Sequence, residues 1–484
     1  MRRARSTLVH AKHGRPQLTS DHFYPEVGIG AVVVGTVLAI ALLPQSDAGG
    51  ENLVWPSIAM SVGLMAAPVL AALRDLRSLL RLEHILPLAL VYWLLLDQLQ
   101  GDTFYPGLTS EDIVYGYVAI GVFAIGGFAF GLVARPQPPR IFMRSATAEL
   151  SPSILFRLAL LCFGLGIFKF AYAVGFNPIQ MIVYAGVGRW SAPWGAARLG
   201  GWNAVLDHMV YFGYLVPVLT VTLASKIGWL KPRTLFLIFC SVLLLILLAQ
   251  GGGRRVVGVM AGAPLVTWVL AQPRINLGRL VIIGFWLAAI LTFFEVMLEY
   301  RNRGLATFFD DPQASIQVDR INVDDNFYRL AQTIQIVPKR HDYVYHQQLV
   351  YTLVRPIPRA LWPGKPVTGG FDLAQFLGTT WLTLSSSVVA EWYISGGLFV
   401  VFLGGVLYGL YARTLGWLWK VTHSGVGRLL YGVSVMALFA GVRSMIDLVL
   451  MSYILLAWLV VWLVLARRNT QHSIRAQHAK SVYE

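Results

Sequence analysis

The sequence predicts an all-α polytopic membrane protein with about twelve transmembrane helices and one large outer loop between the ninth and tenth. Hydrophobic residues make up 56% of the 484 residues and charged residues only 13%, whereas soluble domains carry roughly a quarter charged residues. The mean hydropathy is +0.62. Apolar stretches of about 20 residues recur from Val27 to Ala466, each long enough to cross a bilayer core of about 30 Å.

Hydropathy also places the individual spans. They fall roughly at residues 27–44, 53–73, 85–99, 113–134, 154–175, 204–225, 234–250, 256–272, 280–298, 386–412, 429–446 and 447–466. The chain therefore divides into a basic tail (1–26), a bundle of about nine spans (27–298), the large outer loop (299–385), about three further spans (386–466) and a basic tail (467–484).

Basic residues orient these spans, because short cytoplasmic connectors are enriched in Lys and Arg. Both tails are basic, and so are five internal connectors, near residues 74–81, 135–144, 226–233, 274–279 and 413–428. The opposite connectors are mostly neutral or acidic. We expect both termini in the cytoplasm, and the net charge of +15 then reflects topology rather than nucleic-acid binding.

A second set of basic residues lies on the predicted outer side, against this bias. Its members are Arg254, Arg255, Arg301, Arg303, Arg355, Arg359, Lys365 and Arg443. Arg443 lies inside an apolar run, where an arginine costs at least about 2.5 kcal/mol on insertion scales. Because guanidinium groups pair bidentately with phosphoryl oxygens, the set indicates an anionic ligand at the outer face.

These cations also have structural alternatives. Arg254 and Arg255 follow three glycines at the outer end of a span, where arginines can snorkel to lipid headgroups. The run 356–366 (PIPRALWPGKP) could be a loop anchored at the membrane interface by Trp362. Its four prolines make it rigid, and rigidity around two cations favours a preorganised site.

Two carboxylates are candidate general bases. Glu391 lies near the start of the tenth span, and Glu299 precedes Arg301 at the entry to the outer loop. The alternative for Glu391 is a structural ion pair with Arg443 or another arginine. The remaining acidic residues of the loop are interpreted as a solvated face: Asp310, Asp311, Asp324 and Asp325. The outer segments lack metal-ligand spacings, so no metal or other cofactor is predicted.

The outer loop carries two helical signals. One helix would begin near Asn322 or Asp324 and end before Pro338, lying on the membrane surface or packing on the bundle. Its apolar face would hold Phe327, Leu330, Ile334 and Val337. A second short helix around 346–354 would end at Arg355, because the residue before a proline disfavours the helical region.

Taken together, these segments resemble bacterial Wzy-type oligosaccharide repeat-unit polymerases, which build O-antigens and exopolysaccharides. The resemblance covers roughly residues 250–450 and depends on the order of short motifs: GGGRR, EYRNRG, IPRALWPGKP, AEWYISGG and GVRSMID. The sequence departs from the family pattern at Gly364 and at 346–348, so no role is transferred to those positions.

The resemblance implies a metal-independent glycosyltransferase with a GT-C-like fold in the bacterial inner (plasma) membrane. It would transfer a glycan from undecaprenyl-pyrophosphate onto another lipid-linked repeat unit. The eight outer cations would stabilise the pyrophosphate, and Glu391 or Glu299 would accept the proton of the acceptor hydroxyl. A chain-length regulator, a flippase and membrane lipids are the implied partners.

Other functions fit the same sequence. An O-antigen ligase would share the donor but use a lipid A-core acceptor. A lipid-linked oligosaccharide flippase or transporter would have inverted repeats and charged or broken helices near mid-membrane, and no repeat is visible in the sequence. A structural subunit of an export system would tolerate the loss of single arginines.

Overall fold

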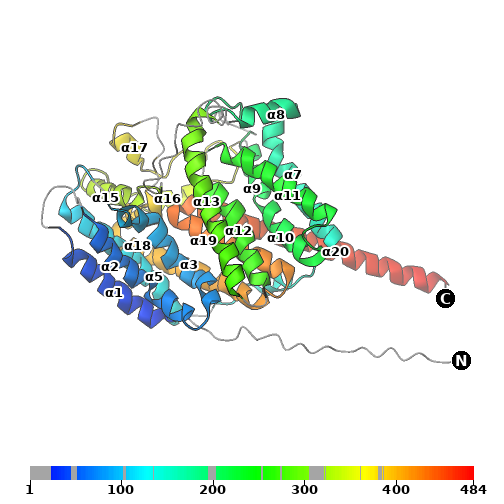
Figure 1. Ribbon diagram of the computed structural model, residues 1–484, viewed down its shortest axis with the longest axis horizontal. Helices are drawn as coiled ribbons and strands as arrows, with labels where there is room; N and C mark the ends of the chain where they lie inside the picture. The colour runs from blue at the N-terminus through cyan, green and yellow to red at the C-terminus, as the bar shows by residue number, and fades with distance from the viewer. Residues whose placement is uncertain are drawn as a thin grey trace.

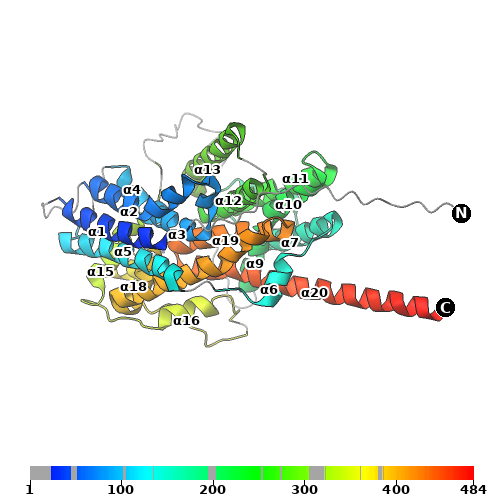
Figure 2. The same cartoon turned by 90° about the horizontal axis from the view of Figure 1, so that it is seen from below.

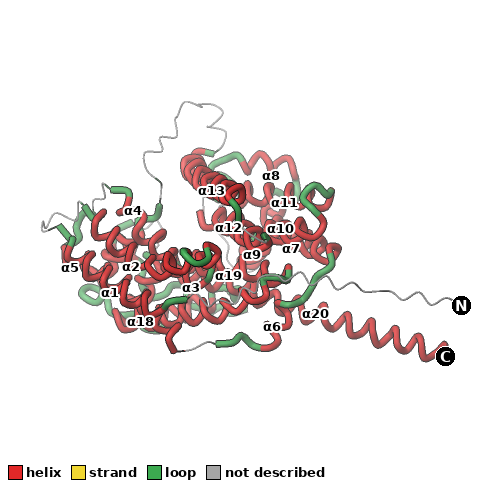
Figure 3. Tube along the Cα trace, turned by 60° about the horizontal axis from the view of Figure 1, so that its bottom comes forward, coloured by secondary structure: helices red, strands yellow, loops and turns green. Residues whose placement is uncertain are grey.

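The chain is described here by a computed structural model. It describes residues 23–44, 52–101, 105–133, 136–194, 203–251, 254–272, 275–304, 321, 323–359, 361–379, 384 and 386–483. The side chains of residues 133, 203–204, 254–255, 298–303 and 465–483 lie outside this description. Over the described ranges the chain is helical, and the only β-type pairing is an isolated bridge between Val187 and Gly304 (Figure 3).

Among the described residues, ten helical segments are long and apolar enough to span a membrane. They are α2 (Val54–Ala72), α3 (Leu82–Leu90) with its continuation to Leu99, α5 (Ser110–Val133), α7 (Pro152–Ala173), α9 (Asn203–Gly213) with α10 (Leu215–Ile227), α11 (Pro232–Ala249), α13 (Leu277–Arg303), α18 (Ser387–Gly416), α19 (Gly425–Arg443) and α20 (Met445–Tyr483). Two shorter apolar helices are α1 (Pro25–Ala41) and α12 (Arg254–Ala271). Each predicted span coincides with one of these twelve, so the polytopic helical fold is confirmed.

The bundle has two sides joined by α19. In Figure 1, α1, α2, α5 and α18 lie on one side and α7 to α13 on the other. Helix α19 contacts α3 and α18 on the first side and α10 and α12 on the second, and it is buried along most of its length. Helix α20 continues well beyond the predicted end of the last span, and its final turns project from the bundle (Figure 1).

Glycines allow the backbones of α5 and α18 to touch where the two helices cross. A Cβ atom on Gly405 of α18 would collide with the carbonyl of Phe123 in α5, and one on Gly409 would collide with the carbonyl of Gly127. Lipid tails are as apolar as the side chains that they contact, so helices in membranes associate largely through such close packing at small residues.

The basic connectors gather at one end of the bundle, as the charge pattern predicts. Arg77 donates to the carbonyl of Gln272 (2.6 Å), which joins the 74–81 connector to the 272–279 connector. Lys226 lies 2.6 Å from the carboxylate of Glu149. This ion pair joins the 226–233 connector to the connector that contains residues 135–144. Four connectors that alternate along the chain are therefore paired at this end.

The predicted outer connectors also contact one another. Tyr328, in the large loop, donates to the carbonyl of Pro106 (2.9 Å), and Gln250 donates to the carbonyl of Val187 (3.0 Å). These contacts match a chain that crosses a membrane back and forth with its connectors sorted to two sides.

Both helices predicted for the outer loop are present. Helix α15 (Asn326–Ile336) packs on α5 and α18, with the whole predicted apolar face buried. Of the two predicted settings, packing on the bundle is therefore the correct one. Helix α16 (Gln347–Val354) ends before Arg355 and contacts α18 and α20. The predicted reason for this end is wrong, because Arg355 itself has helical backbone angles (φ −49°, ψ −42°). A four-residue helix, α17 (Leu373–Phe376), follows. Other short helices occupy connectors: η1 (Leu76–Leu80), α6 (Arg140–Ala146), α8 (Pro178–Ala185) and η3 (Trp417–Val421).

Candidate functional site

Helix α18 is interrupted close to its start. Gly396 and Gly397 leave the helical conformation, and Gly397 has φ +72°, a value that favours glycine. The break leaves the carbonyl of Ile394 free to accept a hydrogen bond from the backbone N–H of Val344 in the outer loop (2.9 Å). A short half-helix, 387–395, is thus held by the loop, and Glu391 lies on it.

Glu391 closes the N-terminus of α20. Ser444, which separates α19 from α20, has extended backbone angles (φ −158°, ψ 139°). The carboxylate of Glu391 accepts hydrogen bonds from the hydroxyl of Ser444 (2.9 Å) and from the N–H of Met445 (2.6 Å). A carboxylate is favoured here because the first N–H groups of a helix lack intrahelical partners and carry the positive end of its dipole.

Arg443, the last residue of α19, is paired with an aspartate from the outer loop. Its Nε lies 2.6 Å from Asp324, and its Nη1 lies 3.7 Å from Asp447. Asp324 has a side chain only 20% exposed, so its assignment to a solvated face is wrong. Asp325, which pairs with Arg329 and is 46% exposed, fits that assignment better. Asp310 and Asp311 lie outside the described residues.

A third irregular segment adjoins this junction. Residues Val91–Leu95 (η2) form a π-helical turn between α3 and α4 (Leu96–Leu99). Trp93 in this turn donates to the carbonyl of Phe439 (2.8 Å), and its ring lies 5.9 Å from the guanidinium of Arg443. Such turns are frequent at functional sites, and irregular backbone at membrane depth has to be covered by protein or line a cavity.

Gln250, which precedes the GGGRR motif, and Gly304, which ends the EYRNRG motif, meet at a different connector. Gln250 contacts Val187 as described above and accepts a hydrogen bond from the indole of Trp194 (2.9 Å), while Val187 pairs with Gly304. The C-terminal end of α11 and the C-terminal end of α13 therefore lie beside one connector. The backbones of Arg254 and Arg255 form the first turn of α12, and those of Arg301 and Arg303 the last turn of α13. Their side chains, and that of Glu299, lie outside the description.

The proline-rich run holds its cations against its own backbone. Lys365 donates to the carbonyls of Arg355 (2.8 Å) and Ile357 (2.7 Å). Arg359 donates to the carbonyls of Lys365 (2.9 Å) and Pro366 (3.1 Å). Burial, with Arg355 and Arg359 nearby, lowers the pKa of Lys365. The guanidinium of Arg355 donates to the hydroxyl of Tyr351 (2.6 Å) and is more exposed.

Among the described side chains, the predicted residues thus form two groups. Glu391 and Arg443 come together at the junction of α19 and α20, whereas Arg355, Arg359 and Lys365 gather in the proline-rich run. Sequence reasoning missed Asp324 and Trp93. A signal existed for Asp324, because an arginine in an apolar run needs an acidic partner. In the part of the chain that the structure describes, no three His, Cys, Asp or Glu side chains are grouped as metal ligands.

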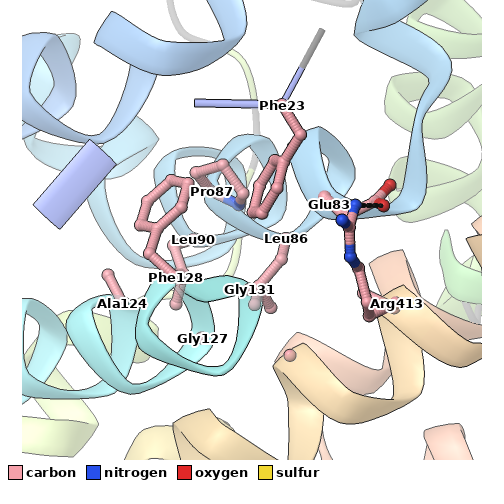
Figure 4. Close-up of a pocket in the computed structure, with 12 residues that line it drawn as sticks. Phe23, Glu83, Leu86, Pro87, Leu90, Ala124, Gly127, Phe128, Gly131 and Arg413 are labelled. Atoms are coloured by element: carbon pink, nitrogen blue, oxygen red, sulfur yellow. Dashed lines mark hydrogen bonds and ion pairs between the residues drawn. The ribbon is translucent and has the colours of Figure 1, made fainter. Parts of the chain in front are cut away.

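A small apolar pocket lies elsewhere, near the basic end of the bundle (Figure 4). Phe23, Leu86 and Phe128 line it together with glycines of α5 and α18. At its edge the guanidinium of Arg413 lies 3.0 Å from the carboxylate of Glu83, and both side chains are nearly buried. None of the predicted site residues lines this pocket, and the ion pair joins α3 to α18.

Removing the carboxylate of Glu391 is expected to destabilise the protein. Glu391→Ala leaves the N–H of Met445 and the hydroxyl of Ser444 without their acceptor, which costs about 1–3 kcal/mol for buried groups. Glu391→Gln keeps one carbonyl acceptor and should cost less. The thermal unfolding midpoints of the detergent-purified proteins should therefore fall from wild type to Glu391→Gln to Glu391→Ala. Equal midpoints for wild type and Glu391→Ala would show that the cap is unimportant.

No protein-family model, curated protein sequence or solved structure matches this chain.

Proposed function

We propose that the protein is a GT-C-like, Wzy-type repeat-unit polymerase of the bacterial inner membrane. It transfers a glycan from undecaprenyl-pyrophosphate onto another lipid-linked repeat unit at the outer face. The main support is that Gln250, at the C-terminal end of α11, and Gly304, directly after α13, both contact Val187. Arg301 and Arg303 lie in the last turn of α13, and Arg254 and Arg255 begin α12, the helix that follows α11. The order of motifs along the sequence supports the same function.

The reaction explains why cations are needed at a membrane surface. The bond between the anomeric carbon of the donor sugar and a phosphate oxygen breaks, and the acceptor hydroxyl oxygen takes its place. The hydroxyl proton goes to a base, and the negative charge left on the lipid pyrophosphate must be stabilised. Arg254 and Arg255 begin an 18-residue helix, whose positive dipole end adds to their own charge.

Glu391 remains the first candidate for the base, with Glu299 as the second. One carboxylate oxygen of Glu391 accepts a hydrogen bond from Ser444, and the other accepts one from Met445. A carboxylate oxygen has two lone pairs, so an acceptor hydroxyl can still donate to it. The neighbouring Arg443 would then act on the same substrate, held by Asp324.

One observation favours a second candidate, a lipid-linked oligosaccharide flippase. Helix α18 is broken at Gly396 and Gly397, and broken helices near mid-membrane are typical of transporters. An O-antigen ligase would use the same donor and a different acceptor. The length of the glycan chains in cells distinguishes these functions. Loss of a polymerase removes the ladder of long chains but leaves the export of single repeat units intact.

Single substitutions at the predicted residues test the polymerase. A deletion strain is complemented with wild type, Arg254→Ala, Arg359→Ala or Glu391→Gln, and the glycan is separated on a gel. We expect the ladder to be lost while single units are exported, because removing one charge-stabilising donor costs about 10²–10³-fold in rate. Arg279→Ala, at the opposite end of α13 from Arg301, is the control and should leave the ladder intact.

The other outcomes are equally informative. A normal ladder from every variant, at normal membrane levels, would contradict the site assignment. Loss of all exported glycan, single units included, would favour the flippase or the ligase.

A further inference from the structure

The proline loop, defined here as residues 353–367, has an apolar exposed surface. Leu361 and Val367 are 66% and 71% exposed, and Leu353, Ile357 and Trp362 are exposed as well. Lys365, by contrast, is only 7% exposed and Arg359 is half-buried, whereas Arg355 near the start of the loop is exposed. A loop in water normally places charges outside and apolar groups inside, whereas the segment from Leu361 to Val367 buries its lysine and exposes apolar side chains. Its outer surface therefore suits an apolar environment.

Several backbone groups of the proline loop are hydrogen-bonded within the loop. The side chains of Lys365 and Arg359 donate to four of its carbonyls, as described above, and the N–H groups of Leu361 and Trp362 donate to the carbonyl of Pro358. Its four prolines have no N–H to satisfy. These internal bonds lower the cost of contact with lipid, because hydrocarbon offers no hydrogen bonds to polar backbone groups.

The loop starts beside the membrane-facing surface of α20. Tyr453 of α20 donates to the carbonyl of Leu353 (3.1 Å). Tyr453 follows the first residue of α20 by eight residues, about 12 Å along the helix at 1.5 Å per residue. The contact therefore lies below the end of the span. Tyr453 also shares one face of α20 with the exposed side chains of Leu456, Val460 and Val464.

Helix α16 and the loop after it lie at the edge of the bundle. Figure 2 shows α16 on the outside of the molecule beside α18, and α16 also contacts α20. The proline loop is thus held at its first residue to the face of α20 that carries exposed apolar side chains. Trp362 belongs to the residue type that is enriched at membrane interfaces.

We propose that the proline loop inserts its apolar face into the outer-leaflet interface of the membrane. Leu361, Trp362 and Val367 contact acyl chains and glycerol groups, and Lys365 and Arg359 serve as internal donors that allow the loop to enter. The occupant of this surface is lipid and not a second protein chain. The inference does not depend on the proposed glycosyl transfer.

Site-directed spin labelling tests this insertion. Single cysteines replace Leu361 or Val367 in a background in which the buried Cys162 and Cys240 are alanine. The labelled protein is reconstituted into phosphatidylethanolamine–phosphatidylglycerol vesicles, and power saturation measures access to oxygen and to Ni-EDDA. Leu456→Cys on the exposed face of α20 is the lipid control, and Lys339→Cys, on an exposed turn of the outer loop, is the water control.

We expect both loop labels to show an oxygen-to-Ni-EDDA ratio several-fold above that of the Lys339 label and close to that of the Leu456 label. A ratio equal to that of the Lys339 label would place the loop in water and overturn the proposal. Low access to both reagents would mean that protein covers the loop, and this result would overturn it too. Since the readout is accessibility, loss of polymerase activity in any variant leaves the test intact.

Discussion

Gly405→Val is expected to remove most of the folded protein from the membrane. A side chain at this position would meet the backbone carbonyl of Phe123, which cannot rotate away. Ordinary overpacking costs about 1–3 kcal/mol because side chains can adjust. Here the helices themselves must separate, and α5 and α18 form one of the most extensive contacts in the bundle. We therefore expect a cost above that range.

The measurement is the yield of monodisperse protein after detergent extraction, with the thermal unfolding midpoint of whatever remains. Gly284→Val is the matched control, because Gly284 lies in the spanning helix α13 and a Cβ there meets nothing within 4 Å. It introduces the same β-branched residue into a helix without a collision. Equal yields for the two variants would contradict the close crossing of α5 and α18.

Arg443→Ala is the second substitution with a large expected effect. It removes the cation beside Asp324 and the nearly buried Asp447. Removing one partner of a buried ion pair costs about 3–5 kcal/mol, because it leaves a charge without compensation. The side chains of Arg443 and Asp324 are 27% and 20% exposed to solvent. We therefore expect the lower end of that range, about 3 kcal/mol.

A double-mutant cycle separates this pair from its surroundings. Adding Asp324→Asn to Arg443→Ala should restore part of the lost stability, with a coupling of at least about 0.5 kcal/mol. Asp325→Asn is the control, since Asp325 pairs with Arg329 at the surface and should change stability little. Strictly additive effects of Asp324→Asn and Arg443→Ala would show that the two residues do not interact.

The helices of this protein could be predicted from local patterns. The ten spanning helices, the shorter apolar helices α1 and α12, and the loop helices α15 and α16 follow from hydropathy and periodicity. The connectors that contact one another also match the charge pattern. Each of these features depends on the free energy of transferring a few neighbouring residues into a membrane or a helix.

The arrangement of the candidate site could be predicted only in part. The sequence indicates Glu391 and Arg443, because ionisable groups are costly inside apolar spans. Their partners were not predicted: Asp324 comes from a different segment, and the acceptor role of Glu391 at α20 depends on how α18 packs against α19. The same holds for Lys365, whose charge was expected to face a ligand and which donates to carbonyls of its own loop.

The sequence by itself determined that this chain is a helical membrane protein, where its spans lie and which residues are unusual in such a setting. Only the tertiary structure decided which of those residues meet, through contacts such as Val187 with Gly304 and Arg443 with Asp324. The physical reason is that hydropathy acts residue by residue along the chain. Pairing between distant segments depends on how whole helices pack, and a local pattern does not contain that information.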